Sequence, residues 1–356
     1  MIKSLQSLRL VFAVMIFLHH FPNAVDGAGL FAAGGALGVC FFIMLSGFVM
    51  SAGYGDKVLS ENFDFKHYFL KRLIRLWPLH LLCLLGFVVL HLQTSFSSIK
   101  SIGVLGINSL MLQSWIPIKG VYFSGNAVSW CLCDLMFCYM MFPVLYRFIN
   151  KVRTKTIVII GLLVAASYFV TIQFIPNYMM HAFLYISPVL RLLDFVLGIL
   201  AYIVYTWMCE GKVKKYLVGC STIKLIGIEI CSLVLLIGCI LTYPCLPEEY
   251  RFASMWWLIC FILIILYSLL DTYGGGYLSK LLRGKMLQKL SAVSFTFYMI
   301  HQLAINVLLT IFVKLQIHIP YLVELIICLF IIMLAALIVN KFFEKPVANY
   351  LSKKYE

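Results

Sequence analysis

The amino-acid sequence predicts an all-α polytopic membrane protein, a bundle of about ten transmembrane helices with both termini in the cytoplasm. Hydrophobic residues make up 63% of the 356-residue chain and charged residues only 12%, which is outside the usual range of soluble domains. Apolar runs long enough to cross a bilayer recur along the whole chain. The segments between them are too short for a soluble unit, so we expect one domain over residues 1–356.

Ten apolar stretches are expected to span the membrane, where a helix needs about 20 apolar residues. They are 8–22, 31–53, 76–93, 127–149, 156–175, 185–208, 223–243, 252–272, 290–313 and 321–343. The stretch 102–118 is apolar but shorter and has Pro117 near its end, so we interpret it as a re-entrant or interfacial segment.

Lysine and arginine predict the orientation of these spans. The formal net charge of +14 would suggest a nucleic-acid partner in a soluble protein, but here the cations cluster between apolar runs. With the N-terminus inside, most of them fall in cytoplasmic loops, in agreement with the positive-inside rule. We therefore expect contact with membrane lipid and no nucleic-acid partner. The cations left outside are Lys100, Lys119, Arg251 and Lys314.

The chain contains twelve cysteines, most of them inside the apolar runs. No Cys-x-x-Cys pair occurs, and the spacing of Cys131 and Cys133 is not one that binds metals. We expect small core residues rather than a disulfide framework, and no metal site.

The first span carries two polar residues on one helical face. Arg9 and His20 are eleven residues apart, which is three turns plus about 20° and about 16 Å along the axis. His19 points roughly 80° away from that face. The separation argues against a direct hydrogen bond and suits an extended ligand lying along the helix. Because both residues cost free energy inside an apolar helix unless they are used, both are candidates for function.

The second span has glycines at helical spacing, which allow another backbone to approach closely. Gly34, Gly35 and Gly38 open it, and Ser46 and Gly47 lie toward its end. The pattern fits simple helix packing. It also fits a role in pressing the first two spans together, so that the two polar residues of the first span are held in place.

The segment FKHYFLKRLIRLWP places Lys71, Arg72 and Arg75 at the predicted inner interface, next to Trp77 and Pro78. Arg72 and Arg75 are three residues apart and share a helix face. One interpretation is a positive-inside anchor on anionic lipid. The other is an anion site for a phosphorylated cytoplasmic substrate, because the arginine fork donates two hydrogen bonds.

Few polar groups remain inside the later spans. Arg191 and Asp194 are three residues apart, so they could neutralise one another. His301 lies near the middle of its span and is either a hydrogen-bonded structural residue or a functional one. Glu344 and Lys345 close the last span, where an ion pair would satisfy them.

These pieces, in this order, resemble the acyltransferase type 3 family of integral membrane proteins over nearly the whole chain. The family opens with an arginine, ten residues and a histidine, as Arg9 and His20 do. Its glycine-rich FFxxSGF motif is similar to GGALGVCFFIMLSGF, which contains Ser46, and its basic motif before a proline is similar to KRLIRLWP. Later similar pieces are PVLRLLDFVLG with Arg191, SFTFYMIHQ with His301 and the terminal FFEKP.

The chain departs from the family pattern at one acid. The family has WSL followed by an acid five residues after the tryptophan, where this chain has Leu135. Asp134 lies one position earlier, which turns the side chain by about 100° on a helix. The chain ends at Glu356 soon after the last span, so we expect none of the SGNH-type hydrolase domain that some members carry.

The resemblance implies transfer of an acyl group, usually acetyl, from cytoplasmic acyl-CoA to a sugar hydroxyl. The acceptor would be a cell-surface polysaccharide such as O-antigen or capsule, or its lipid-linked precursor, and the location the bacterial inner membrane. Arg72 and Arg75, with Lys71, would hold the CoA phosphates. His20 would act as general base or, alternatively, as acyl carrier, and Arg9 would orient the donor or stabilise developing negative charge. Further candidate site residues are Ser46, Asp134, Arg191 and His301.

A transporter or flippase for lipid-linked sugars is the alternative class. It explains ten spans and a polar interior equally well. It does not explain the spacing of Arg9 and His20 beside a cytoplasmic arginine cluster, and it would consume no CoA thioester.

Overall fold

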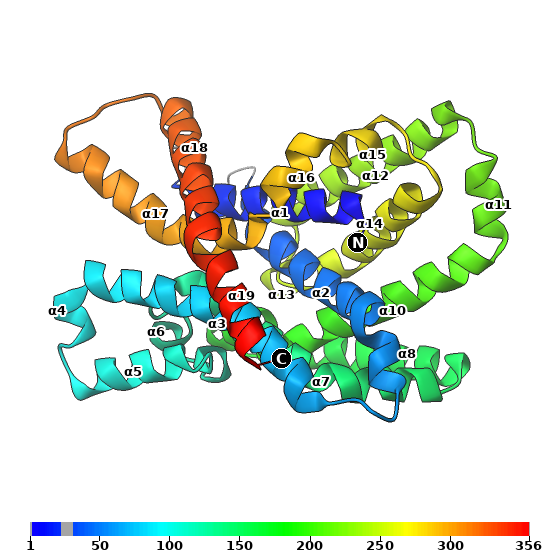
Figure 1. Cartoon of the computed structure of the whole chain (residues 1–356), viewed down its shortest axis with the longest axis horizontal. Coiled ribbons are helices and arrows are strands. Elements are labelled where there is room, and N and C mark those ends of the chain that lie inside the picture. The colour runs from blue at the N-terminus through cyan, green and yellow to red at the C-terminus, as the bar shows by residue number, and fades with distance from the viewer. Residues whose placement is uncertain (1, 23–30, 356) are drawn as a thin grey trace.

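The computed structural model describes residues 2–22 and 31–355, and within these ranges the chain is built of helices and connecting loops (Figure 1). Nine of the helices described are long and apolar enough to cross a membrane. The predicted class, an all-α polytopic membrane protein, is confirmed. The nine are α2 (Gly34–Leu59), α3 (Phe65–Leu90), α7 (Trp130–Lys151), α8 (Thr154–Thr171), α10 (Pro188–Glu210), α12 (Thr222–Thr242), α14 (Ser254–Tyr273), α17 (Ser294–Lys314) and α18 (Tyr321–Val339).

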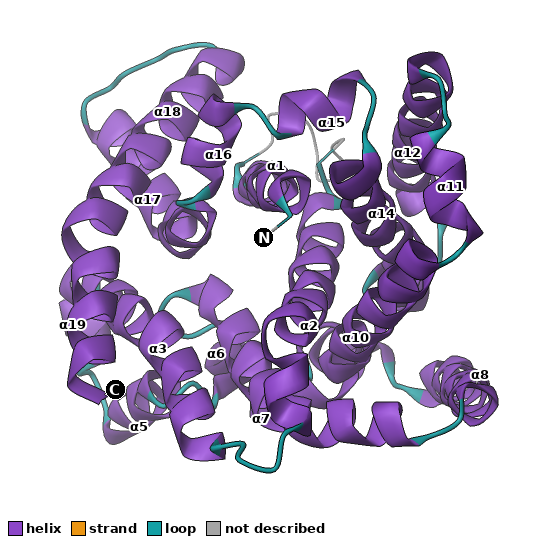
Figure 2. Ribbon diagram, turned by 45° about the vertical axis from the view of Figure 1, so that its right-hand side comes forward, coloured by secondary structure: helices purple, strands orange, loops and turns teal. Residues whose placement is uncertain are grey.

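The tenth predicted span, α1 (Lys3–His20), is a helix but is less apolar than the other nine, because it contains Lys3, Arg9 and two terminal histidines. It runs through the middle of the molecule and contacts α2, α14, α17 and the short helix α16 (Lys285–Ser291) (Figure 2). Protein therefore surrounds this helix. Polar residues in membrane helices are expected to face a bundle interior in this way.

Glycines bring α2 close to its neighbours. A Cβ atom at Gly34 would collide with the Met15 carbonyl of α1, and one at Gly38 would collide with the Ile16 side chain. The predicted close approach of the first two spans is therefore confirmed. Gly47, nearer the other end of α2, faces the backbone of α10 in the same way, which the sequence did not predict.

Helix α3 starts earlier than expected. The predicted span was 76–93, but the helix runs Phe65–Leu90 and includes the basic segment. Asp64 caps its first turn by accepting a hydrogen bond from the backbone N–H of His67 at 3.1 Å. Pro78 lies inside the helix, which membrane helices tolerate when neighbouring groups satisfy the freed backbone carbonyl. The arginines therefore project from a continuous helix.

The apolar stretch 102–118 contains no candidate span, in agreement with its predicted interfacial or re-entrant character. It lies in the 11-residue helix α5 (Ile99–Ser109) and in short turns that return the chain to the bundle. Trp77 of α3 holds this segment, because its indole Nε1 donates a hydrogen bond to the Ser109 carbonyl at 2.8 Å.

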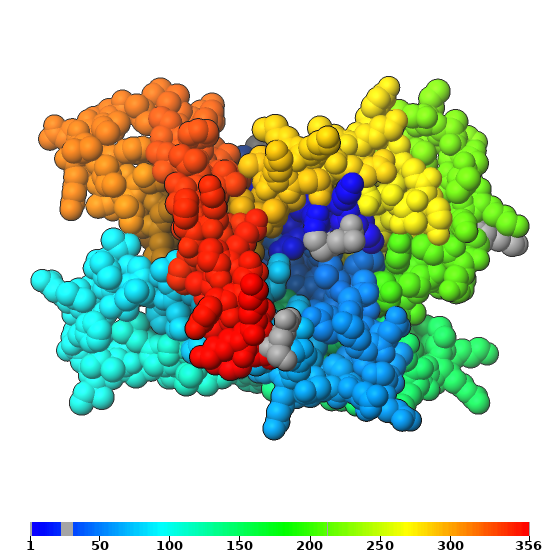
Figure 3. All heavy atoms as spheres, viewed as in Figure 1, coloured from blue at the N-terminus to red at the C-terminus, as the bar shows by residue number. Residues whose placement is uncertain are grey.

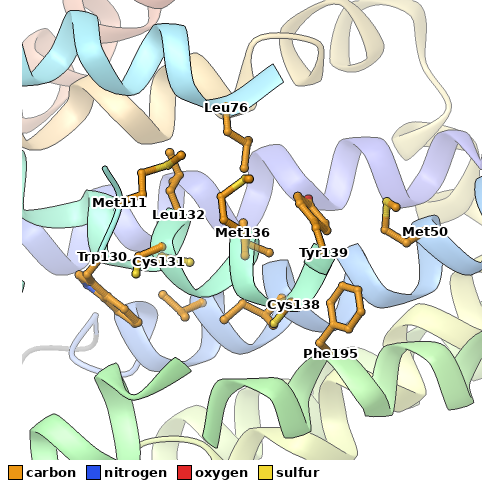
Figure 4. Close-up of a cluster of buried hydrophobic side chains, with 14 of the residues drawn as sticks. Met50, Leu76, Met111, Trp130, Cys131, Leu132, Met136, Cys138, Tyr139 and Phe195 are labelled. Atoms are coloured by element: carbon orange, nitrogen blue, oxygen red, sulfur yellow. The ribbon is translucent and has the colours of Figure 1, made fainter. Parts of the chain in front are cut away.

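Helices α3, α7 and α10 contribute to one buried apolar cluster (Figure 4). Leu76 of α3 and Met136 of α7 point toward one another, and Phe195 of α10 belongs to the same cluster. Cys131 and Cys138 are also part of it. All twelve cysteines are free, and seven of them are buried; Cys231 and Cys245 are exposed, so the expectation of small core residues holds for only part of the set.

The C-terminal part of the chain packs over α3. Helix α18 continues through a π-helical turn, Asn340–Glu344, into α19 (Lys345–Tyr355), which contacts α3 on the face shown in Figure 3. Turns of this kind are rare and occur frequently at functional sites. The other short α-helices are α4 (Leu92–Ser95), α6 (Lys119–Tyr122), α9 (Asn177–Met180), α11 (Lys212–Val218), α13 (Glu248–Arg251) and α15 (Tyr277–Leu282).

Candidate active site

A cavity of about 220 Å³, here named the central cavity, lies where α1, α2, α3, α7 and α17 meet. It brings together Arg9, Arg72 and Arg75, three predicted site residues from two separate helices. No carboxylate occurs among the described residues that line it. Its polar lining residues are Arg9, Ser46, Arg72, Arg75, Tyr139, Ser294 and Tyr298.

Arg72 is held inside the bundle by α2. Its Nη2 donates a hydrogen bond to the Tyr54 hydroxyl at 2.6 Å, and its guanidinium lies 4.7 Å from the centre of the Tyr54 ring. Its Nε is buried and has no hydrogen-bond partner among the described residues. A lipid anchor would extend its charged end toward the headgroups. The inward position favours the ligand-binding interpretation of Arg72.

A second cavity, of about 420 Å³, adjoins the central cavity, and Arg72 and Arg75 line both. We name it the basic cavity. Lys71 and Lys345 also line it, and so does one side of α19. The predicted phosphate-binding residues Lys71, Arg72 and Arg75 thus share one site. Because arginine and lysine together suit phosphate groups, the basic cavity is the natural entrance for an anionic ligand.

Glu344 is a carboxylate in the lining of the basic cavity. It accepts hydrogen bonds from the Thr296 hydroxyl and, at 2.8 Å, from the Asn340 amide. The ion pair with Lys345 that the sequence suggested is not formed within the described part of the chain. Neutral donors satisfy the carboxylate instead, because Asn340 lies one turn before it and Thr296 faces it from α17.

Arg9 lies where the central cavity meets a third cavity, of about 410 Å³. The rings of Phe48, Tyr202 and Tyr205 contribute to the wall of this third cavity. Arg75 is close enough to Arg9 for electrostatic interaction between the two guanidinium groups. Like charges therefore converge on the central cavity from α1 and α3.

His20 lies at the opposite end of α1 and does not line the central cavity. Its Nδ1 is 3.0 Å from Nε2 of His301 in α17. His301 is fully buried, and its Nδ1 donates a hydrogen bond to the Tyr298 carbonyl at 2.6 Å. The sequence presents His301 as an isolated histidine within a span. The fold instead pairs it with His20.

The face of α1 between its two functional candidates is packed rather than open. Ala13 and Ile16 on this face are 0% and 1% exposed. The expected extended ligand along α1 therefore has no room there, because α2 and α17 cover the helix. The central cavity extends toward α17 instead, where Tyr298 is one turn before His301.

Asp134 lies outside the central cavity. Its side chain is fully buried and accepts a hydrogen bond from the Ser114 hydroxyl at 2.7 Å. Leu135, at the position of the family's acid, lines the cavity. Consecutive residues on α7 differ by a turn of about 100°, so Leu135 faces the central cavity while Asp134 faces the segment that contains Ser114.

Ser46 lines the central cavity, and its hydroxyl donates to the Phe42 carbonyl at 2.8 Å. Arg191 lies elsewhere and forms the predicted ion pair with Asp194, at 2.9 Å and fully buried. Asp194 also accepts a hydrogen bond of 2.5 Å from the indole Nε1 of Trp257. Arg191 is therefore engaged in packing α10 and does not meet the other site candidates.

Sequence reasoning missed the residues that hold the charged groups of the site. Tyr54 positions Arg72 from another helix, and Thr296 does the same for Glu344. A contact between helices leaves no local pattern in the chain. The one available signal for Thr296 was its place inside the SFTFYMIHQ segment.

Comparison with known proteins shows that the chain is a membrane-embedded acyltransferase. The profile of the acyltransferase domain matches residues 2–341, so the chain belongs to the acyltransferase 3 family. The resemblance seen in the sequence motifs is thereby confirmed, and the protein is a multi-pass membrane enzyme.

Two relatives are similar to this chain. "Acyltransferase MdmB" of Streptomyces mycarofaciens is 27% identical over 289 residues, which cover 76% of this chain and 68% of the relative. "Putative acetyltransferase ORF330" of Acidianus two-tailed virus is 29% identical over 171 residues, 48% of each chain. No solved structure matches this one.

Proposed function

We propose that this acyltransferase moves an acetyl group from acetyl-CoA to a hydroxyl group of a carbohydrate. The observation that carries the proposal is the convergence of Arg9, Arg72 and Arg75 on one cavity whose described lining contains no carboxylate. The Glu344 carboxylate lines the adjoining basic cavity, but the three arginines exceed its charge, and excess cationic charge inside a membrane bundle is unfavourable. A ligand with several phosphates compensates more than one of them at once, and CoA is such a ligand.

The donor enters through the basic cavity. Its phosphates bind Arg72 and Arg75, with Lys71 beside them, and the planar guanidinium groups hold phosphate through paired hydrogen bonds. The pantetheine arm then continues into the central cavity toward Tyr298, past a largely apolar wall. Arg9 orients the donor in the central cavity, and the thioester extends beyond Arg9 toward Tyr298, because His20 lies about 16 Å further along α1.

His20 is the general base of the transfer. Its Nε2 takes the proton of the acceptor hydroxyl, whose oxygen attacks the carbonyl carbon of the thioester. The carbon–sulfur bond breaks, the ester forms, and the proton passes to the departing CoA thiolate. Imidazole suits this exchange because an unprotonated ring nitrogen can take the proton and then donate it.

The acceptor is a cell-surface polysaccharide such as O-antigen or capsule, or its lipid-linked precursor, and the location is the bacterial inner membrane. The family motifs around Arg9, His20 and Ser46 support this assignment. The relative named as an acetyltransferase supports acetyl as the group transferred. His20 is partly exposed at the end of α1 that lies away from the basic cavity, so an acceptor from the outer side could reach it.

Mass spectrometry of the surface polysaccharide tests this function in cells that carry the chain and are fed labelled acetate. We expect labelled acetyl groups with the unmodified chain and none with His20→Ala, at equal amounts of protein in the membrane. His19→Ala is the matched control, because His19 packs against Gly35 at the neighbouring position. Undiminished acetylation in His20→Ala would contradict the proposed role of His20.

The same cells distinguish a wrong acceptor from a wrong reaction. If neither chain labels the polysaccharide, the purified chain is incubated with acetyl-CoA and a glycolipid extract of the cells, and the release of CoA is measured. Release of CoA would support acetyl transfer and show that the acceptor is a molecule other than the surface polysaccharide. No release would contradict acetyl-CoA as the donor.

A further inference from the structure

The partly exposed His20 and the buried His301 form a hydrogen-bond chain with a fixed direction. Nδ1 of His301 lies 2.6 Å from the Tyr298 carbonyl oxygen, which can only accept, so this nitrogen carries a proton. His301 is 0% exposed and no carboxylate among the described residues bonds to it. A charged ring is costly in such a place, so His301 is neutral and its Nε2 keeps a lone pair.

The protonation of His301 determines which ring nitrogen of His20 carries the proton. Its Nδ1 lies 3.0 Å from the Nε2 lone pair of His301, so Nδ1 of His20 must donate the hydrogen bond between them. A neutral imidazole carries one N–H. The other nitrogen of His20, Nε2, is therefore left without a proton and can accept one.

We propose that His301 is a positioning residue that holds His20 in the tautomer whose Nε2 is the base. The inference rests on the proposed role of His20 and goes beyond it, because it assigns the residue that decides which nitrogen of His20 reacts. Without the hydrogen bond to Nε2 of His301, the proton of His20 could occupy either ring nitrogen, and the tautomer that is protonated at Nε2 has no base at that atom. In other enzymes a hydrogen-bonded partner likewise holds the catalytic histidine in the correct tautomer and orientation.

The frame around His301 is well fixed. The Tyr298 hydroxyl donates to the Val128 carbonyl at 2.8 Å, and the Asn126 amide donates to the Met299 carbonyl at 2.7 Å. Both bonds tie α17 to the segment just before α7. The carbonyl that orients His301 therefore belongs to a helix turn that is anchored by two hydrogen bonds to one segment.

Two amide variants test the proposal, His301→Gln and His301→Asn. The longer glutamine amide can reach His20 with its oxygen. This oxygen then replaces Nε2 of His301 as the hydrogen-bond acceptor. The asparagine amide can donate to the Tyr298 carbonyl but is one methylene too short to reach His20. The assay is the release of CoA from acetyl-CoA by the full chain in lipid vesicles, with the glycolipid extract of the cells as acceptor.

We expect His301→Gln to keep most of the kcat, and His301→Asn to lower kcat about 10- to 100-fold, which is part of the 10²–10⁴-fold that a general base contributes. The KM for acetyl-CoA should be unchanged in both, because His301 lies away from the arginines. Equal kcat values in the two variants would overturn the proposal. His20→Ala in the same assay tests the proposed function separately from the role of His301. Full activity of His20→Ala would contradict the role of His20 as general base.

A measurement on the unaltered protein does not depend on how the variants fold. Nitrogen NMR of histidine-labelled protein, with the His20 signals assigned by their loss in His20→Ala, reports which ring nitrogen is protonated. We expect a protonated Nδ1 and an unprotonated Nε2 at His20. The opposite tautomer would overturn the proposal whatever the variants do.

Discussion

Arg72 owes its position to a hydroxyl group on the neighbouring helix. Because Tyr54 holds the guanidinium over the central cavity, we expect Arg72→Ala to raise the KM for acetyl-CoA about ten-fold or more, with a smaller change in kcat. A hydrogen bond to a charged group contributes about 1.5–3 kcal/mol, which sets this size. Tyr54→Phe keeps the ring but removes the hydroxyl, so it should raise KM less. Steady-state kinetics with varied acetyl-CoA measures both.

The control for a lipid anchor is Arg153→Ala. Arg153 is an exposed cation just before α8 and lines none of the three cavities described here. Its replacement should leave the KM for acetyl-CoA unchanged. Similar effects of Arg153→Ala and Arg72→Ala, or none from either, would mean that Arg72 serves the membrane surface and not the donor.

Asp134 is expected to stabilise the fold without taking part in the reaction. Its hydrogen bond from Ser114 ties α7 to the segment that returns from α5, and Leu135 occupies the cavity position. Asp134→Leu leaves the buried Ser114 hydroxyl without its acceptor, so we expect a loss of about 1–3 kcal/mol in unfolding free energy. Thermal unfolding measures this loss. Unchanged stability together with a large fall in kcat would instead make Asp134 part of the chemistry.

At the scale of the helices, α2 is the element on which the packing depends. A Cβ atom at Gly47 would collide with the Phe195 carbonyl of α10, and one at Gly198 of α10 would collide with the Met44 carbonyl of α2. Backbone atoms cannot move aside as side chains can. We therefore expect Gly47→Ala and Gly198→Ala to lower the unfolding free energy by about 1–3 kcal/mol or more, as overpacking does.

The matched control lies on the same helix. Nothing is within 4 Å of a Cβ atom at Gly53, so Gly53→Ala should be neutral or slightly stabilising, because alanine is the better helix former. Thermal unfolding in detergent compares the three variants. Equal losses at Gly47 and Gly53 would mean that the cost does not come from the contact between α2 and α10.

The sequence predicts contacts that are encoded in one helix and misses those that need two. Glycine spacing in α2 predicts the approach of α1, and the spacing of Arg72 and Arg75 predicts a shared face. The early start of α3 was signalled by Asp64 but lies within polar sequence that hydropathy alone discounts. The partner of His301 comes from the other end of the chain, and no pattern within α17 specifies it.

At the scale of the whole molecule, α1 joins two sides of the enzyme. Its N-terminal half carries Arg9 into the central cavity, beside the arginines of α3. Its C-terminal end carries His20 to the histidine pair with α17. The face between them is packed, so an acceptor at His20 would approach from the end of α1 opposite to the arginines that we propose to bind the donor.

This arrangement requires α1 to cross the membrane, although it is the least apolar of the ten predicted spans. Its 18 residues extend about 27 Å, close to the hydrocarbon thickness of about 30 Å. Its first residues bond to the far end of α14, where the backbone N–H of Lys3 donates to Asp271 at 2.9 Å. Its last turn packs against the beginning of α2, where His19 contacts Gly35. The helix therefore runs antiparallel to α2 over its whole length.

Reporter fusions decide whether α1 crosses. With ten spans both termini lie in the cytoplasm, so a green fluorescent protein should fluoresce at either end, and alkaline phosphatase should be active when inserted in the loop between α17 and α18. If only the nine apolar helices crossed, the termini would lie on opposite sides of the membrane. A dark N-terminal fusion beside a bright C-terminal one would then place Arg9 and His20 on a helix that does not span, and the path proposed for the acetyl group would fail with it.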